Sequence, residues 1–419
     1  MDQPLGFVDP QNASLVCKLH KALYGLKQDP RAWFSTFSSF LLSEEFIQSK
    51  CDSSLFIRKS STSVTYILIY VGNILFTGNN QSYIQTLLAH MHLAFSMKKL
   101  GNISYFLGIS VQPNSHGFFL SQYTYATELL VKAGMVDCKP YAIPISVKLP
   151  NEAADSLPCA QPFLYRSIDG TLQYLTITRP ELSYVVNQAC QFMHSPTVGH
   201  LSLVKLILRY VKGTLVHGLH FTSSHFGLHA YSDSNWAGDL ADKRSTSSYC
   251  VYLGNNLISW SSKKQSTVSR SSTEAEYRSS VHTAAELTWL QMLLVDFSIP
   301  HTSLPVLWCD YLSSISLSTN SAFHSRSKHI EVDCHFVRDK VVAHQLILKY
   351  VHTTDQLAVI FTKPLSTAHF SYLTHKLMVS HLPMCLTGDD RERPSADHNL
   401  ADPVDHNAVH NPADHNGVV

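Results

Sequence analysis

Three short segments decide the fold of the C-terminal half of the chain: GLHAYSDS (residues 227–234), SSYCVYLG (247–254) and NLISWSSKK (256–264). Each has the length and composition of a short strand, and turn residues separate it from the next. Their succession predicts an antiparallel meander.

The segment 271–297 is predicted to form one long helix, because its apolar residues recur at helical spacing. The residues expected on the buried face of this helix are Val281, Ala284, Ala285, Trp289, Met292 and Leu293. A strand (304–310), a helix (328–344) and a further strand (346–353) then alternate. Three strands followed by alternating helix and strand predict a mixed α/β sheet.

The N-terminal half is predicted to be a smaller α/β assembly. Trp33, Phe37, Phe40 and Leu41 recur at helical spacing and indicate an amphipathic helix. The other elements expected there are a strand (54–58), a hairpin (65–78) with its turn at Gly72-Asn73, a helix (81–95) and a strand pair (105–111 and 117–122). A Pro-rich polar linker (139–163) and two or three helices connect the two halves.

The composition is that of a globular protein, with 419 residues, 45% hydrophobic and 11% aromatic. The formal net charge is +1, but the residues from Thr387 onward carry seven acidic and two basic side chains, so the preceding body carries +6. A mildly basic body is compatible with a phosphate-rich partner. The nine cysteines form no C-x-x-C pair, which argues against a zinc knuckle. No leader or membrane-spanning run is found, so we expect a cytoplasmic protein without a membrane partner, and a nuclear location is the alternative.

Three acidic residues are candidates for a metal site. Asp233 and Asp310 each end a predicted strand, and Glu276 lies near the start of the long helix. Carboxylates that converge on one sheet edge repel one another unless cations neutralise them, and carboxylate oxygens are the ligands that Mg²⁺ prefers. The alternative is that each acid is a solvated helix-start or capping residue.

Several longer motifs resemble the reverse transcriptase of copia-type retrotransposons, and others resemble the ribonuclease H domain that follows it in the same polyprotein. The first group is LHKALYGLKQDPRAW (19–33), SKCDSSLF (49–56), YFLGISV (105–111), YRSIDGTLQYLTITRPELSY (165–184) and LRYVKGT (208–214). The second group is YSDSNWAGD (231–239), KRSTSSYCVYLG (243–254), ISWSSKKQSTVSRSSTEAEY (258–277) and KHIEVDCHFVRDKV (328–341).

We expect four parts of the chain. Three of these match the family: a truncated reverse transcriptase with palm and thumb remnants (1–138), a connection region of linker and helices (139–225) and a ribonuclease H-like domain with a mixed five-stranded sheet (226–385). The fourth, the low-complexity tail (386–419), has no counterpart in the family, and its lack of large apolar residues predicts disorder. The resemblance also implies a two-ion Mg²⁺ site and an RNA–DNA hybrid or another nucleic acid as partner. Association with intact copies of the polyprotein is a further expectation.

The resemblance assigns Asp233, Glu276 and Asp310 as catalytic, metal-binding acids, and it exposes losses elsewhere. The polymerase hairpin of the family carries Asp-Asp where this chain has Gly72-Asn73, and the third polymerase Asp lies upstream of a segment matched by Gln3–Phe7. The fourth ribonuclease H acid is replaced by Val359 in the segment LAVIFTK (357–363). Smaller departures are Asn235, Ser248, Tyr311 and Lys99.

These losses leave three functions open. The chain is a retrotransposon-derived fragment without polymerase activity and with impaired ribonuclease H activity, or a catalytically dead binder of nucleic acid, or a relic without function. Phosphate contacts are considered for Lys27, Arg31, Lys263 and Lys264, and a solvated surface is an equal alternative for each.

Overall fold

The computed structural model describes residues 3, 6–12, 14–17, 28–70, 73–95, 97–98, 101–145, 156–239, 241–299, 303–312, 315 and 331–381, so the expected disordered tail lies outside the described residues. The chain divides into two compact units, one ending at Leu100 and the other beginning at Gly101. This division differs from the expected domain boundaries at residues 138 and 225. No helix in the described ranges is both long and apolar enough to cross a membrane.

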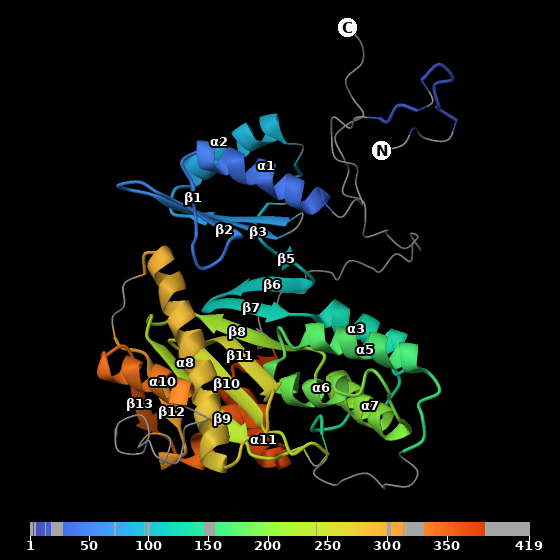
Figure 1. Cartoon of the computed structure of the whole chain (residues 1–419), viewed down its shortest axis with the longest axis vertical. Coiled ribbons are helices and arrows are strands. Elements are labelled where there is room, and N and C mark those ends of the chain that lie inside the picture. The colour runs from blue at the N-terminus through green and yellow to red at the C-terminus, as the bar shows by residue number, and fades with distance from the viewer. Residues whose placement is uncertain are drawn as a thin grey trace, which may run out of the picture. The chain divides into compact units, whose positions relative to one another are not determined.

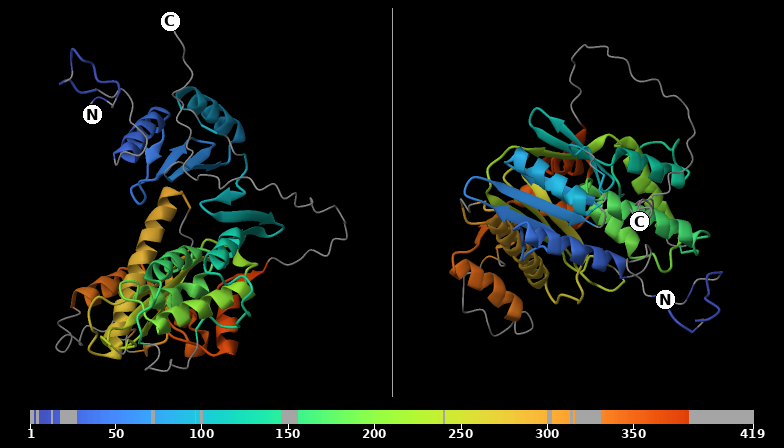
Figure 2. Two further views of the ribbon diagram at one scale, coloured as in Figure 1. Left: turned by 90° about the vertical axis from the view of Figure 1, so that its right-hand side faces the viewer. Right: turned by 90° about the horizontal axis from the view of Figure 1, so that it is seen from above.

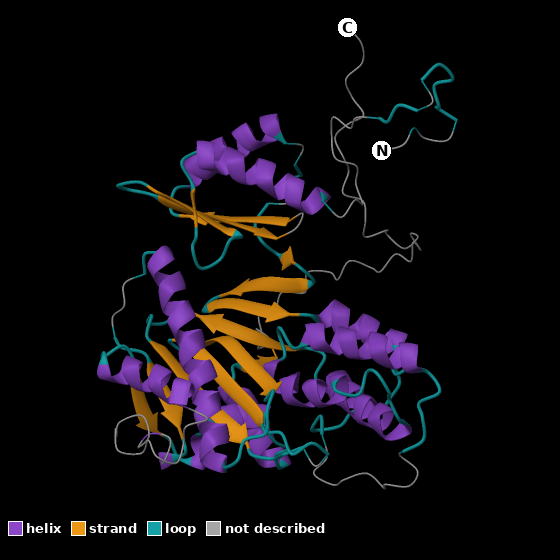
Figure 3. Ribbon diagram, viewed as in Figure 1, coloured by secondary structure: helices purple, strands orange, loops and turns teal. Residues whose placement is uncertain are grey.

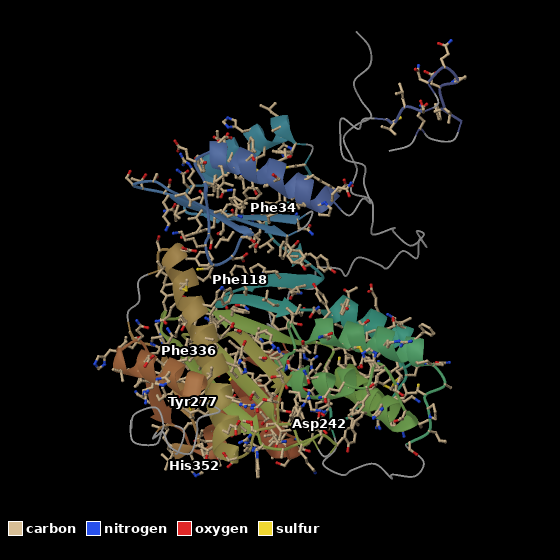
Figure 4. All side chains as sticks on the ribbon, viewed as in Figure 1. Phe34, Phe118, Asp242, Tyr277, Phe336 and His352 are labelled. Carbon is tan, nitrogen blue, oxygen red and sulfur yellow. The ribbon has the colours of Figure 1, made fainter. Side chains whose placement is uncertain are left out.

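The first unit packs two helices on an antiparallel sheet of order β1-β2-β3-β4 (Figure 1). Its elements are α1 (Asp29–Ser43), β1 (Ile47–Gln48), β2 (Leu55–Lys59), β3 (Val64–Tyr70), β4 (Asn73–Gly78) and α2 (Gln81–Ala94). Phe37 and Leu41 of α1 are fully buried with Ile67 of β3 and Met91 of α2, so the predicted amphipathic helix does cover the sheet. Phe34, labelled in Figure 4, packs at the border of this core against Phe56.

The hairpin between β3 and β4 has a register that differs from the predicted one. Tyr70 pairs with Asn73, so Asn73 is the first residue of β4 rather than a turn residue, and Val71 and Gly72 lie outside the described residues. This register sets Ile69 opposite Ile74 and is followed by two further apolar pairs, Leu68 with Leu75 and Ile67 with Phe76, which stabilise it.

The second unit contains two five-stranded sheets (Figure 3). The first, of order β14-β8-β7-β6-β5, is antiparallel and consists of β5 (Tyr105–Phe106), β6 (Ile109–Asn114), β7 (Gly117–Ser121), β8 (His217–Thr222) and β14 (Val379–His381). Because β7 pairs with β8, the predicted strand pair β6–β7 belongs to the same unit as the C-terminal half. This pairing explains why the chain divides at Gly101 and not at residue 138.

Between β7 and β8, the described residues form four helices and a 3₁₀ turn. They are α3 (Tyr123–Lys132), α5 (Pro162–Leu175), η1 (Pro180–Leu182), α6 (Ser183–Cys190) and α7 (Val198–Gly213). Their buried faces form one large apolar core that also includes residues of the second sheet. The predicted helices of the connection region are therefore confirmed.

The second sheet of this unit has the order β11-β10-β9-β12-β13. Its strands are β9 (Leu228–Asn235), β10 (Thr246–Leu253), β11 (Asn256–Lys264), β12 (Val306–Cys309) and β13 (Ile347–Tyr350). The first three form an antiparallel meander, and β12 is parallel to both β9 and β13. This confirms the predicted mixed α/β sheet of five strands.

Helices cover both faces of that sheet (Figure 2). Val251 of β10 packs with α8 (Ser272–Asp296) and α10 (Glu331–Val342), while its neighbours Cys250 and Tyr252 pack with the large helical core. Alternation of side chains along a strand produces this two-sided burial. The chain then continues from β13 through η4 (Thr353–Asp355), η5 (Leu357–Phe361) and α11 (Thr367–Lys376).

The buried face of α8 agrees with the predicted one only in part: Ala284 is buried and Val281 packs against the same core. Trp289 and Met292 are 39% and 53% exposed, whereas Ser279, Ser280 and Thr283 are almost fully buried. The hydroxyl of Thr283 donates to the carbonyl of Ser279, at 2.8 Å, so this polar stripe is hydrogen-bonded where it meets the sheet. Tyr277, labelled in Figure 4, is fully buried on the same helix.

Candidate metal centre

The three predicted acids meet at one edge of the second sheet. Asp233 lies near the end of β9, Asp310 directly follows β12, and Glu276 lies near the start of α8. Because β9 and β12 are parallel neighbours with Ser232 opposite Cys309, their next residues emerge at the same edge. One carboxylate oxygen of each acid lies within 4.8 Å of the others.

This carboxylate triad is the one such cluster in the described part of the chain, where no other three His, Cys, Asp or Glu side chains converge closely enough to share an ion. The hairpin that the resemblance assigns to the polymerase offers Asn73, an exposed residue with a neutral amide. Gly72 is outside the described residues.

Each acid of the triad accepts a hydrogen bond from the protein. The hydroxyl of Thr362 donates to Asp233 Oδ2, and the hydroxyl of Thr353 donates to Asp310 Oδ2 at 3.2 Å. The backbone N–H of Ser234 donates to Glu276 Oε1, also at 3.2 Å. Sequence reasoning missed both threonines, although Thr362 lies in the LAVIFTK segment that carries the Val359 replacement.

Further hydrogen bonds join η5 and α8 to β9, the strand that carries Asp233, and to its neighbour β10. The amide of Gln356 donates to the carbonyl of Ser232 at 2.9 Å, and the hydroxyl of Ser248 donates to the carbonyl of Ala358 at 2.9 Å. The hydroxyl of Ser279 is 2.9 Å from the backbone carbonyl of Asp233. Ser248, a departure from the family motif, therefore contributes to the attachment of η5 to the sheet.

The triad carries more negative charge than its surroundings stabilise. Burial raises the pKa of Asp233 to about 6, and the nearby charge of Asp310 adds to this shift. Burial, together with the charges of Asp233 and Asp310, raises the pKa of Glu276 well above its usual range. The positive charge of Lys363 opposes both shifts.

A divalent cation fits this arrangement, because three hard oxygen ligands converge and the single positive charge of Lys363 relieves their mutual repulsion only in part. Asp233, Glu276 and Asp310 are the residues that would hold the ion.

Among the positions that depart from the family motif, Lys99 lies outside the described residues, and Val359, Asn235 and Tyr311 lie in or next to segments that carry or contact the triad acids. Val359 is 1% exposed within η5 and belongs to the apolar core. Its carbonyl accepts a hydrogen bond from the backbone N–H of Thr362 at 3.1 Å, so it lies in the same short segment as a contact to Asp233. Asn235 donates through Nδ2 to the carbonyl of Thr362, and Tyr311 receives a hydrogen bond from Thr273.

One of the basic residues considered for phosphate contacts is paired with acids. Lys264 Nζ lies 2.5 Å from Asp239 Oδ2 and 2.8 Å from Asp242 Oδ2. Its charge is largely neutralised, which disfavours the predicted phosphate contact at this position. Lys27 lies outside the described residues.

Comparison with known proteins gives matches along most of the chain. Residues 1–147 match the family model described as "Reverse transcriptase (RNA-dependent DNA polymerase)". The retrovirus-related Pol polyproteins from transposons RE1 and RE2 of Arabidopsis thaliana are 44% and 45% identical over 384 and 386 residues, or 91% of this chain. The chain spans 26% of the length of each polyprotein. An uncharacterized mitochondrial protein of Arabidopsis thaliana is 50% identical over 225 residues, which cover 54% of this chain and 93% of that protein.

Two solved structures are also similar in part. A foamy viral protease-reverse transcriptase in complex with an RNA/DNA hybrid has a TM-score of 0.45 and 13% identity, covering 82% of this chain and 40% of that chain. The N-terminal RNase H domain of a Mycobacterium tuberculosis protein, fused to maltose-binding protein, has a TM-score of 0.24 and 12% identity, covering 36% of this chain and 98% of that one.

The sequence matches show a retrotransposon-derived protein of the reverse transcriptase and ribonuclease H-like class, and the mixed five-stranded sheet carries the carboxylate triad at one edge. The chain belongs to the family of copia-type retrotransposon Pol polyproteins, of which it represents a fragment.

Proposed function

We propose that this fragment cleaves the RNA strand of RNA–DNA hybrids slowly through the carboxylate triad and has no polymerase activity. The convergence of Asp233, Glu276 and Asp310 within 4.8 Å carries the proposal. Divalent ions in such sites activate water and stabilise the leaving oxygen of a phosphodiester.

The protein's own residues prepare this site in three ways. Asp233 and Glu276 are held on β9 and α8, so the carboxylates converge without further rearrangement of the backbone. The hydroxyl of Thr362 fixes the carboxylate of Asp233. The ammonium group of Lys363 reduces the repulsion within the triad.

Val359 supports the expectation of slow cleavage. A buried valine supplies no oxygen ligand where the family has a fourth acid, so a second ion would be bound poorly. Loss of one charge-stabilising partner in the transition state costs a few kcal/mol, which corresponds to roughly a hundredfold or more in rate. Mn²⁺ should support faster cleavage than Mg²⁺, because Mg²⁺ requires near-ideal octahedral coordination.

The proposed absence of polymerase activity rests on Gly72 and Asn73. Glycine offers no ligand, and the amide of Asn73 cannot balance the charge of a divalent ion. We therefore expect no templated nucleotide addition on any primer–template.

A second candidate function is binding of hybrid without cleavage, which the loss of the fourth acid at Val359 favours. Incubation of the folded protein with an RNA–DNA hybrid and either Mg²⁺ or Mn²⁺, beside the Asp310→Asn variant, separates the two. Cleavage that Asp310→Asn abolishes supports the first function. Binding without cleavage supports the second.

A further inference from the structure

Two threonines contact the carboxylate triad from the segment that follows β13. The first, Thr353, lies in η4 and donates to Asp310 Oδ2 at 3.2 Å. The second, Thr362, directly follows η5 and donates to Asp233 Oδ2. The two hydroxyls thus reach two of the three acids from the two ends of one short stretch of chain.

The environment of Thr362 fixes its side chain. It is fully buried, and its hydroxyl also lies 3.1 Å from the carbonyl of Val359. The segment around it is attached to the sheet by Gln356 and Ser248, through the hydrogen bonds to Ser232 and Ala358 described above. The hydroxyl therefore has little freedom to leave Asp233.

A hydrogen bond to one oxygen restricts rotation of a carboxylate and leaves its other oxygen available. For Asp233 and Asp310, the contacted oxygen is Oδ2 in each case. Hydrogen bonds of this kind orient metal ligands and tune their affinity.

We propose that Thr353 and Thr362 are positioning residues that hold Asp310 and Asp233 in the orientation that binds a divalent cation. This inference rests on the proposed metal site and adds the residues that organise it. Thr362 has the larger effect, because its contact is buried whereas that of Thr353 is exposed to water.

The test replaces each hydroxyl with a methyl group and measures Mn²⁺ affinity by calorimetry on the whole chain. Thr362→Val keeps the shape of the side chain and should weaken Mn²⁺ binding by about ten- to hundredfold. Thr353→Val should weaken it by roughly three- to tenfold. Thr362→Ser and Thr353→Ser keep the hydroxyl and should stay within about threefold of the parent.

Matched controls come from threonines whose hydroxyls do not contact the triad. Thr374→Val removes a buried hydroxyl that donates to the carbonyl of Phe370 in α11. Thr354→Val removes the exposed hydroxyl of the residue next to Thr353. That hydroxyl contacts the ring of His352. Both controls should bind Mn²⁺ as tightly as the parent.

The outcomes separate this inference from the proposed function. If the parent binds Mn²⁺ and the valine variants bind it equally well, Thr353 and Thr362 do not position the triad, while the metal site stands. If the folded parent binds no Mn²⁺, both proposals are wrong. If Thr362→Val does not fold, the exposed Thr353→Val decides, and unchanged affinity there overturns the inference.

Discussion

Replacement of Asp169 by Asn should stabilise the protein at neutral and alkaline pH. Asp169 lies in the middle of α5 and is 0% exposed. Ile168 and Leu172, which lie near it in the same helix, belong to the apolar core. Among the described residues, neither carboxylate oxygen of Asp169 has a hydrogen-bond partner within bonding distance. The nearby hydroxyl of Tyr165 donates to the carbonyl of Ala189, and its interaction with Asp169 opposes the effect of burial on the pKa of Asp169 without cancelling it.

Burial determines the size of the effect. It raises the pKa of Asp169 from its usual value of 3.8 to about 7. As pH rises above about 4, the unfolded chain loses this proton first, while the folded protein retains it until about pH 7. The free energy of unfolding therefore falls as pH rises through this interval. Each unit of difference between the pKa values of Asp169 in the folded and unfolded states corresponds to about 1.4 kcal/mol, so the total loss is about 4 kcal/mol.

Asparagine has nearly the same shape and stays neutral, so Asp169→Asn removes this pH-dependent loss. Urea denaturation at several pH values should give equal stabilities near pH 4 and a variant more stable by up to about 4 kcal/mol near pH 8. The triad is the same in both proteins, so its contribution to stability cancels in the difference. Asp137→Asn, at an exposed position, is the matched control and should show no such trend. A stability difference for Asp169→Asn that does not change between pH 4 and 8 would refute the reasoning.

Two further substitutions test the site and the core. Val359→Asp should raise Mn²⁺-dependent hybrid cleavage at least about tenfold, because it restores the missing acid, and an unchanged rate in a folded, hybrid-binding variant would count against this assignment. Arg179 Nε lies 2.7 Å from Glu181 Oε1 in the protein interior. Glu181→Gln should destabilise the protein by about 3–5 kcal/mol, because it leaves the buried guanidinium without its counter-charge. A melting temperature equal to that of the parent would contradict this second expectation.

The sequence predicted the strands of the second sheet because their order and length are local properties. The meander β9–β11 and the later strands β12 and β13 follow from short apolar runs between turn residues, and all five are present. The long helix α8 is present as well, but its buried face was predicted only in part, since Ala284 is buried whereas Trp289 and Met292 are exposed. Ser279 and Thr283 appear polar in the sequence and are buried because their hydroxyls find backbone acceptors.

The convergence of the acids in the candidate site could be predicted from the sequence, but the threonines that donate hydrogen bonds to them could not. Asp233 and Asp310 stand at strand ends, and neighbouring parallel strands bring such ends together. The contact of Thr362 with Asp233 joins residues 129 positions apart, and neither residue carries a local signal of it. For the same reason, the pairing of β7 with β8 could not be inferred from the pattern of either strand.

The most direct test of ribonuclease H-type chemistry at the carboxylate triad is a cleavage assay with the purified whole chain, a uniform RNA–DNA hybrid and excess Mn²⁺. A cooperative thermal transition verifies that each protein is folded. Asp310→Asn removes a triad carboxylate, and Asp339→Asn removes an exposed carboxylate of α10 as the matched control. We predict slow cleavage by the parent and by Asp339→Asn, and none by Asp310→Asn. No cleavage by the folded parent, or equal cleavage by Asp310→Asn, would contradict ribonuclease H-type chemistry at this triad.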